Sequence, residues 1–266
     1  MPIRYDLREH VVTITIDRYE RRNAIDPDHA AQLIDCWERF RDDDEAWVAI
    51  ITGVRNVFCS GGDLNAMGVI AQELAECGTS PTRDRMRNFG QGGFTLKEFD
   101  IFKPIIAAVN GYCMAGGMEL LGGTDLRIAS SDAVFSVTEP RRGLFAGGGT
   151  TARLPRQLGW PAAMEFLLVA GNVSAARALQ LGLLNEVVAP EDLLNAANRW
   201  AREIVKNAPL AVQATKKSAV LGFQAASLQD AYRIEDGCSD EVFVTEDARE
   251  GVAAFLEKRA PVWKGR

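Results

Sequence analysis

The sequence predicts an α/β fold for the first two thirds of the chain and a mostly helical region after it. Up to about Gly149, short apolar runs with strand patterning alternate with amphipathic segments of helical spacing, which is typical of an α/β core. Beyond that point one amphipathic segment follows another. The 266 residues, 47% of them hydrophobic and 25% charged, suffice for one large globular domain or two small ones.

The first strand and the first helix are expected between residues 11 and 37. Residues 11–16 (VVTITI) alternate apolar side chains with threonine, which is a strand pattern. Asp26 then supplies an N-cap and Pro27 a first helical position, and apolar side chains recur at helical spacing after them.

Two glycine-rich turns come next, each after an apolar run that predicts a buried strand. FCSGGDL at residues 58–64 follows the run at 46–52, and NGYCMAGGMEL at 110–120 follows the run at 105–109. Each turn opens into a helical pattern. Glycine lets a ligand approach the backbone closely, and a helix N-terminus adds unpaired N–H donors, so both turns are suited to an oxyanion.

Two more short strands are expected at 126–129 and 133–137, and helices fill most of the remainder. Helical segments are predicted at 150–159, 161–171, 174–182 and 190–205, with two more after Pro209 and a short apolar interruption at 185–188. The segment 78–93 is the most loop-like, and we expect a substrate-binding flap there.

Composition argues against several classes of function. The formal net charge of −6 is spread along the chain without a basic cluster, so we expect neither a nucleic-acid partner nor attraction to an anionic membrane. The five cysteines are scattered without CxxC spacing, which favours free thiols over disulfides or a zinc site. The opening residues MPIRYDLREH carry no secretory or transit pattern, and no apolar run reaches about 18 residues, so we expect a cytoplasmic protein.

Carboxylates are the best catalytic candidates. The only histidines, His10 and His29, lie far from both glycine turns, and the sequence has neither a P-loop nor a GxGxxG motif. Glu119 lies early in the helical pattern after the second turn, where favourable interaction with the helix dipole is its alternative role. Glu139 ends a strand-like run, and Pro140 favours an extended conformation there; a solvated acid at a strand end is the alternative.

Together these motifs resemble the crotonase (enoyl-CoA hydratase/isomerase) superfamily. SGGDL is similar to the family turn G-[AG]-D-[LI], and NGYCMAGGMEL to N-G-x-x-x-G-G-G-x-E-L. EPRRGLFAGGGTTARLPRQLG is similar to a third block that begins at the second glutamate, and RRNAI and AFLEKRAPVWKG extend the likeness over nearly the whole chain. The resemblance implies a spiral of ββα units as the α/β catalytic core (residues 1–190), a helical trimerisation region (191–266), and a homotrimer or a dimer of trimers.

The resemblance also assigns catalytic roles. The N–H groups of Gly62 and Gly116 form an oxyanion hole for a thioester carbonyl, Glu119 activates water, and Glu139 exchanges the proton at the α-carbon. The presence of both glutamates favours hydration of a 2-enoyl-CoA to a 3-hydroxyacyl-CoA, or the reverse dehydration, with no cofactor and no metal beyond the acyl-CoA substrate itself. The alternatives are another enolate reaction (isomerase, carnitinyl-CoA dehydratase, hydrolase or decarboxylase) and a non-catalytic acyl-CoA-binding homologue.

Coenzyme A contacts follow from the same resemblance. The implied binding residues are Arg22, Ala24, Gly62, Asp63, Leu64, Asn65, Gly116, Phe255 and Lys258, of which the last two reach the coenzyme A of a neighbouring subunit. Arg22 supplies charge for a phosphate or else is an exposed loop arginine. Asp63 serves equally well as a helix N-cap.

Some positions depart from the family pattern. Ala115 stands where many members have glycine and Ala146 where many have proline, so the acyl pocket is expected to be unusual. Arg141 and Arg142 are expected on the surface; the alternative is that one of them turns inward, lowers the pKa of Glu139 and pairs with a polar acyl group. The residues expected to shape the acyl pocket are Met67, Phe89, Phe94, Met118, Phe145 and Trp160.

Overall fold

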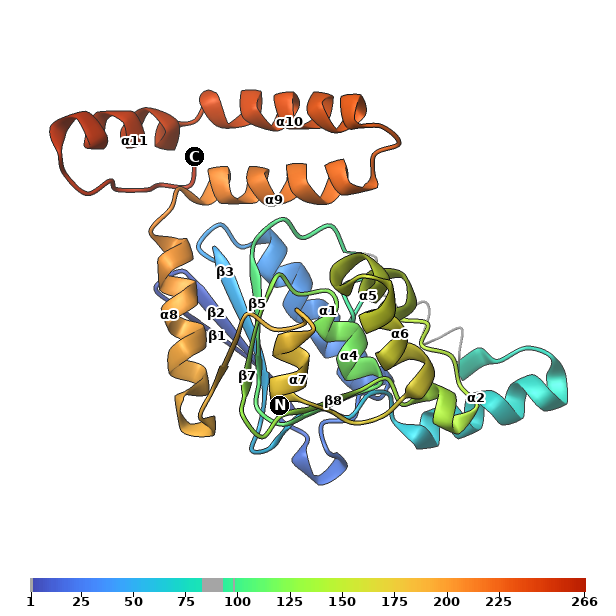
Figure 1. Ribbon diagram of the computed structural model, residues 1–266. Helices are drawn as coiled ribbons and strands as arrows, with labels where there is room; N and C mark the ends of the chain where they lie inside the picture. The colour runs from blue at the N-terminus through green and yellow to red at the C-terminus, as the bar shows by residue number, and fades with distance from the viewer. Residues whose placement is uncertain (1, 83–92, 98) are drawn as a thin grey trace.

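A six-stranded main sheet forms the centre of the computed structural model, which describes residues 2–82, 93–97 and 99–266 (Figure 1). The strand order is β1-β2-β3-β5-β7-β10; only β1 is antiparallel to its neighbour. The strands are β1 (Ile3–Arg8), β2 (Val11–Ile16), β3 (Val48–Gly53), β5 (Ile105–Val109), β7 (Leu126–Ser130) and β10 (Glu186–Val188). The predicted flap falls largely on residues 83–92, and Phe89 with it, outside the described residues.

A second, smaller sheet turns the body into a spiral. Its strands, in the order β4-β6-β8-β9, are β4 (Val57–Cys59), β6 (Tyr112–Met114), β8 (Val134–Ser136) and β9 (Val173–Ser174). Along the chain β3 leads to β4 and α2 (Leu64–Cys77), β5 leads to β6 and α4 (Gly116–Leu121), and β7 leads to β8 and the 3-10 helix η2 (Glu139–Arg142). The predicted ββα spiral is confirmed. The strands β4 and β6 escape sequence analysis because three residues carry no periodicity.

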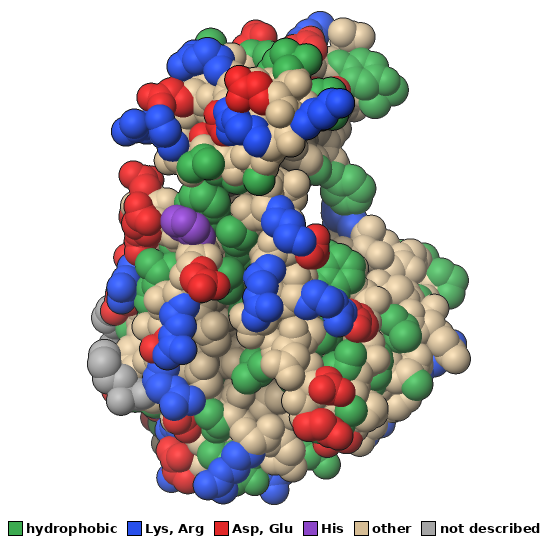
Figure 2. Space-filling model, turned by 90° about the vertical axis from the view of Figure 1, so that its left-hand side faces the viewer, with side chains coloured by type: hydrophobic (Ala, Val, Ile, Leu, Met, Phe, Trp, Pro, Cys, Tyr) green, Lys and Arg blue, Asp and Glu red, His purple; other side chains and the backbone are tan. Residues whose placement is uncertain are grey.

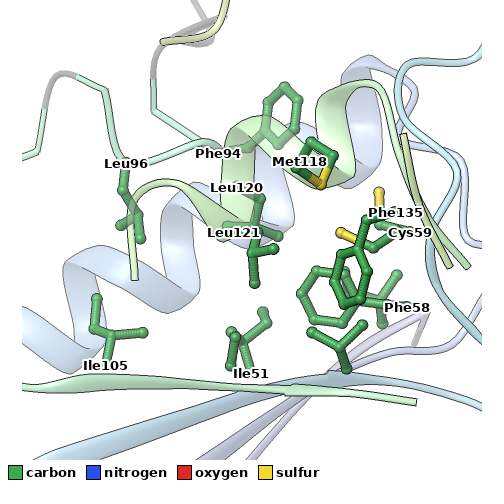
Figure 3. Close-up of a cluster of buried hydrophobic side chains, with 14 of the residues drawn as sticks. Ile51, Phe58, Cys59, Phe94, Leu96, Ile105, Met118, Leu120, Leu121 and Phe135 are labelled. Carbon is green, nitrogen blue, oxygen red and sulfur yellow. The ribbon is translucent and has the colours of Figure 1, made fainter. Parts of the chain in front are cut away.

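The main core lies between the two sheets and the helices α1 (Pro27–Asp42) and α4. In Figure 3, Ile51 points from the main sheet toward Leu121 on α4, and Ile105 lies below Leu96. Phe58 and Phe135 of the second sheet fill the adjacent space. This packing holds α4 against both sheets, and α4 carries one of the candidate glutamates.

The opposite face of the main sheet is covered by α8 (Leu193–Val205). Side chains alternate along β3, so that Val48 and Ile50 face α8 while Ile51 faces the main core. The chain between β8 and β10 forms α5 (Thr150–Leu158), α6 (Trp160–Val169) and α7 (Ala175–Gln180); the 3-10 helices η1 (Tyr19–Arg21) and η3 (Pro190–Asp192) complete the body.

Three helices follow Pro209, where the sequence predicted two. They are α9 (Pro209–Gln224), α10 (Leu228–Phe243) and α11 (Glu246–Glu257). The third is separate because Thr245 caps a new helix, its side chain accepting a hydrogen bond from the N–H of Ala248. These helices form a layer beyond the end of the sheet (Figure 1).

The helical layer exposes many apolar side chains. Those at least two-thirds exposed are Phe223, Leu228, Phe243, Val244, Phe255 and Leu256. Figure 2 shows basic and acidic side chains intermixed on one face of the molecule, over both the layer and the body. Within the described ranges, no helix combines the length and apolarity needed to span a bilayer.

Candidate active site

The two glycine turns meet in space. Each follows a strand of the second sheet, and β4 and β6 are parallel neighbours, so both turns leave the same edge. A Cβ atom on Gly116 would lie 3.3 Å from Gly61 Cα and 3.4 Å from Gly62 N. Among the described residues, neither the N–H of Gly62 nor that of Gly116 donates to a protein acceptor. The turns therefore present two free donors side by side.

The backbone before Gly116 is strained. Ala115, the N-cap of α4, has φ 49° and ψ −119°, a conformation that glycine adopts far more readily. Alanine is thus accommodated at this position, but in a conformation that costs of order 1–3 kcal/mol. Gly117 lies against β4, where a Cβ would overlap the Cys59 carbonyl oxygen. Close packing of α4 on β4 fixes this turn and with it the direction of the Gly116 N–H.

Glu119 lies one turn into α4 and is 8% exposed. Its Oε1 accepts a hydrogen bond of 2.5 Å from the N–H of Gly148, a residue 29 positions further along the chain. Burial raises the pKa of Glu119, while the Gly148 hydrogen bond and the charges of Lys97 and Arg153 act in the opposite direction. The hydrogen bond and these two positive charges therefore favour the ionised carboxylate, against the effect of burial.

Glu139 begins the 3-10 helix η2, so the extended conformation predicted for it is wrong. Proline is tolerated in the first turn of a helix because the N–H it lacks would have no intrahelical partner there. The Glu139 side chain is 8% exposed, and within the described chain its Oε2 has no hydrogen-bond partner. Burial raises the pKa of Glu139 to about 7, and the nearby charge of Glu119 adds to the effect. Glu139 can therefore be neutral while Glu119 is ionised.

Both glutamates and both turns line one cavity of about 1080 Å³. The predicted site residues that line it are Arg22, Ala24, Gly62, Asp63, Leu64, Asn65, Gly116, Glu119 and Glu139. Asp63 is also the N-cap of α2, its Oδ1 accepting from the N–H of Asn65. The cavity is large enough for an extended ligand that passes from the Arg22 loop to the two carboxyl groups.

Phe255 and Lys258 do not line this cavity. Phe255 is 83% exposed on α11, and Lys258 ends that helix in a left-handed conformation. Both belong to the helical layer, on the opposite side of the body from α2 (Figure 1). Contact with a ligand in the cavity would have to come from another copy of the chain.

The residues expected to shape the acyl pocket divide into three groups. Met67, Phe94 and Phe145 line the cavity. Met118 is buried in the main core, and Trp160 is exposed at the start of α6. Neither of these two is among the cavity-lining residues.

Lys97 and Gly148 line the cavity although they were not among the predicted site residues, and Arg142, for which an inward position was left open, lines it as well. Arg142 is exposed, as expected of a surface arginine, but it lies at the mouth of the cavity and donates from Nη1 to the Thr138 carbonyl. Lys97 Nζ donates to the Gly147 carbonyl. Gly148 belongs to the glycine run of the third motif, EPRRGLFAGGGTTARLPRQLG. Nothing in that motif indicates that its N–H donates to Glu119.

In the part of the chain that the structure describes, no group of three or more histidine, cysteine, aspartate or glutamate side chains is arranged to bind a metal ion. His29 Nδ1 instead lies 2.5 Å from the Asp26 carboxylate, and His10 stacks on Trp47.

Comparison with known proteins places this site in a family. The family model for enoyl-CoA hydratase/isomerase matches residues 6–266. An (E)-benzylidenesuccinyl-CoA hydratase of Thauera aromatica is 38% identical over 266 residues, covering 100% of both chains. A carnitinyl-CoA dehydratase of Salmonella typhi is 39% identical over 266 residues, covering 96% of this chain and 95% of its own.

Solved structures agree with this assignment. An enoyl-CoA hydratase from Bacillus anthracis superposes with a TM-score of 0.89 at 30% identity over 100% of both chains. EchA1 from Mycobacterium marinum superposes with a TM-score of 0.87 at 36% identity, over 100% of this chain and 99% of its own. The fold and the paired carboxyl groups define a crotonase-type protein. The chain belongs to the enoyl-CoA hydratase/isomerase family.

Proposed function

We propose that the protein is a lyase that hydrates a 2-enoyl-CoA to the 3-hydroxyacyl-CoA and catalyses the reverse dehydration. The observation that carries the proposal is the meeting of two buried carboxyl groups with two free N–H donors in one cavity. An isomerase or hydrolase needs fewer of these groups, because neither reaction adds water across a double bond.

The reaction follows from the protonation states. The thioester oxygen accepts hydrogen bonds from the N–H groups of Gly62 and Gly116, which stabilise the enolate. Ionised Glu119 takes a proton from a water molecule while the oxygen of that water bonds to C3. Neutral Glu139 gives its proton to C2. Water thus adds across the double bond, and the pair still holds one proton.

We infer that coenzyme A extends along Arg22, Ala24 and residues 63–65, which line the cavity beyond Gly62. The exposed apolar side chains of α9–α11 support assembly into a homotrimer or a dimer of trimers, in which Phe255 and Lys258 approach a neighbour's coenzyme A. No cofactor besides the substrate's own coenzyme A is required. The five free cysteines suit the reducing conditions of the cytoplasm.

The acyl group is expected to be neutral or anionic. Within the described chain, Lys97 and Arg142 line the cavity without an ion-pair partner, and each lies close enough to influence a catalytic carboxyl group. Two cations beside the acyl group disfavour a quaternary ammonium, as in a carnitinyl group, and favour a carboxylate, as in a benzylidenesuccinyl group.

A substrate panel tests both statements. Crotonyl-CoA, a 2-enoyl-CoA with a carboxylate on the acyl chain, and one with a trimethylammonium group are each incubated with the protein, and products are identified by mass spectrometry. We expect products heavier by one water, with kcat/KM at least about tenfold lower for the trimethylammonium substrate than for crotonyl-CoA. A preference for the trimethylammonium substrate would overturn the charge argument alone; no gain of water on any substrate would overturn the hydratase.

A further inference from the structure

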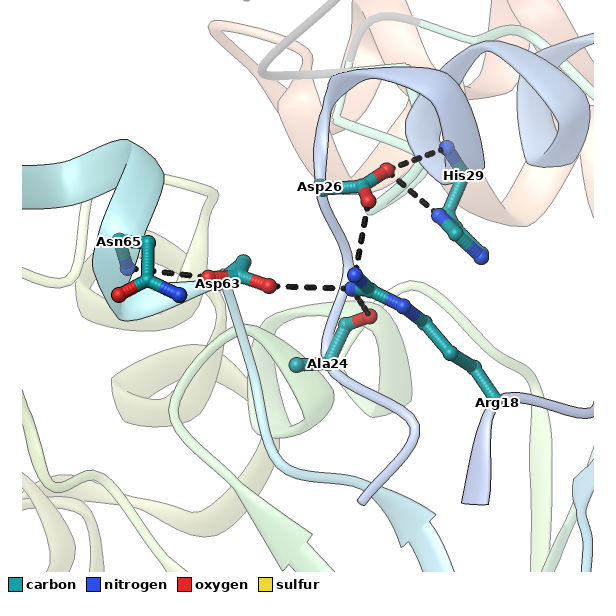
Figure 4. A network of polar contacts seen from close by, with 6 residues as sticks. All are labelled: Arg18, Ala24, Asp26, His29, Asp63 and Asn65. Atoms are coloured by element: carbon teal, nitrogen blue, oxygen red, sulfur yellow. Dashed lines mark hydrogen bonds and ion pairs between the residues drawn. The ribbon is translucent and has the colours of Figure 1, made fainter. Parts of the chain in front are cut away.

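Arg18 holds together the two loops that lead into the cavity. It lies between β2 and η1, and its side chain is 14% exposed. Nη1 donates to the Ala24 carbonyl at 2.9 Å and to Asp63 Oδ2 at 3.1 Å, while Nη2 lies 3.0 Å from Asp26 Oδ2 (Figure 4). One guanidinium therefore joins the N-cap residues of α1 and α2, which are far apart in sequence.

These contacts enclose Gly62 from both sides. The N–H of Ile25 donates to the Gly61 carbonyl at 2.8 Å, and the N–H of Asp63 donates to the Ile25 carbonyl at 2.9 Å. The loop that holds Gly62 is thus bonded to Ile25 before and after that residue. Arg18 in turn holds the Ile25 loop through Ala24 and Asp26, and the Gly62 loop through Asp63.

The two carboxylate oxygens of Asp63 accept hydrogen bonds from different partners. Its Oδ1 accepts from the N–H of Asn65 and caps α2, while Oδ2 accepts from Arg18. Removing the guanidinium would leave Asp63 and Asp26, both shielded from solvent, without the cation between them. Repulsion between the two carboxylates would then act directly on the residue next to Gly62.

We propose that Arg18 is a positioning residue that sets the direction of the Gly62 N–H and thereby the strength of the oxyanion hole. The inference rests on the proposed function, because it takes Gly62 as a donor to the thioester oxygen. Lysine replaces the guanidinium only partly, since a single ammonium lacks the planar fork that reaches two carboxylates and a carbonyl together.

Isotope-edited infrared spectroscopy of a bound thioester tests the proposal. Butyryl-CoA labelled with 13C at C1 has no double bond to hydrate, so its carbonyl stretch reports the hydrogen bonds alone. In the wild type we expect this stretch to shift to lower frequency on binding. In Arg18→Met most of the shift should disappear and kcat with crotonyl-CoA should fall at least about tenfold, with KM changed less than about threefold. Arg18→Lys should lie between the two.

Lys216→Met is the matched control. Lys216 is 16% exposed and also joins a carbonyl and a carboxylate, those of Lys103 and Asp125, but it does not line the cavity. It should keep the full shift. An Arg18→Met protein with the full shift and an unchanged kcat, whatever its thermal stability, would overturn the proposal; if it does not fold, the same result in Arg18→Lys would do so. A wild type that binds butyryl-CoA without any shift would instead contradict the proposed function.

Discussion

Glu139→Gln is expected to lower kcat for hydration by a factor of about 10² to 10⁴, the usual contribution of a positioned general acid. Glutamine keeps the size and most of the packing of the side chain but cannot give a proton to C2. Steady-state kinetics with the best thioester of the substrate panel measures the loss. Glu191→Gln, a change at an exposed glutamate outside the cavity, is the control and should leave kcat unchanged.

The pH dependence gives this prediction a second readout. Burial raises the pKa of Glu139 to about 7, so wild-type kcat/KM should fall as the pH rises through that value and the acid loses its proton. The raised pKa also means that the folded state favours the protonated form, so wild-type stability should decline as the pH rises from the ordinary glutamate value toward 7. Glu139→Gln should show neither decline. Wild-type kinetics that are flat through pH 7 would contradict the role of Glu139 as the acid.

Gly148→Ala is expected to lower kcat by about 10², because a new Cβ would overlap the Glu119 carboxyl group. The carboxyl group would have to turn away, and the N–H that holds it in place would lose its partner. The backbone at Gly148 is not in the left-handed region, so alanine should not disrupt the loop itself. Kinetics together with the thermal unfolding midpoint separate displacement of Glu119 from loss of the fold.

Gly147→Ala is the comparison for this loop. Its Cβ would meet nothing closer than 3.9 Å, so kcat should change by less than about threefold. If Gly148→Ala were as active as Gly147→Ala, Glu119 would not depend on the Gly148 hydrogen bond, and its proposed role as the base would lose its structural support.

Sequence patterns predicted much of the fold because the main strands are long enough to show alternation or an apolar run. Residues 11–16 and 105–109 are strands at the predicted bounds, and Asp26 caps its helix as expected. Of the second sheet only β8 was predicted, within residues 133–137; β4, β6 and β9 were missed because strands of two or three residues show no period. β1 was also missed, although its side chains alternate between sheltered and exposed positions, as expected of an edge strand with one solvated face.

The candidate site was also only partly predictable from the sequence. Motif resemblance found the glycine turns and both glutamates because each lies within a local pattern. The Gly148 bond to Glu119 and the Arg18 bond to Asp63 join residues 29 and 45 positions apart, and neither pair has a periodic or compositional signature. Such contacts arise only when the spiral brings separate ββα units to one edge.

The central claim, that water adds across the double bond of an enoyl thioester, is tested most directly by isotope incorporation. Crotonyl-CoA is incubated with the protein in deuterated, 18O-enriched water, and the product is analysed by mass spectrometry and NMR. We predict a 3-hydroxyacyl-CoA with 18O on C3 and deuterium on C2. A 3-enoyl-CoA with deuterium on C2 and no 18O, 18O in a released carboxylic acid, or bound but unchanged crotonyl-CoA would each contradict the hydratase mechanism.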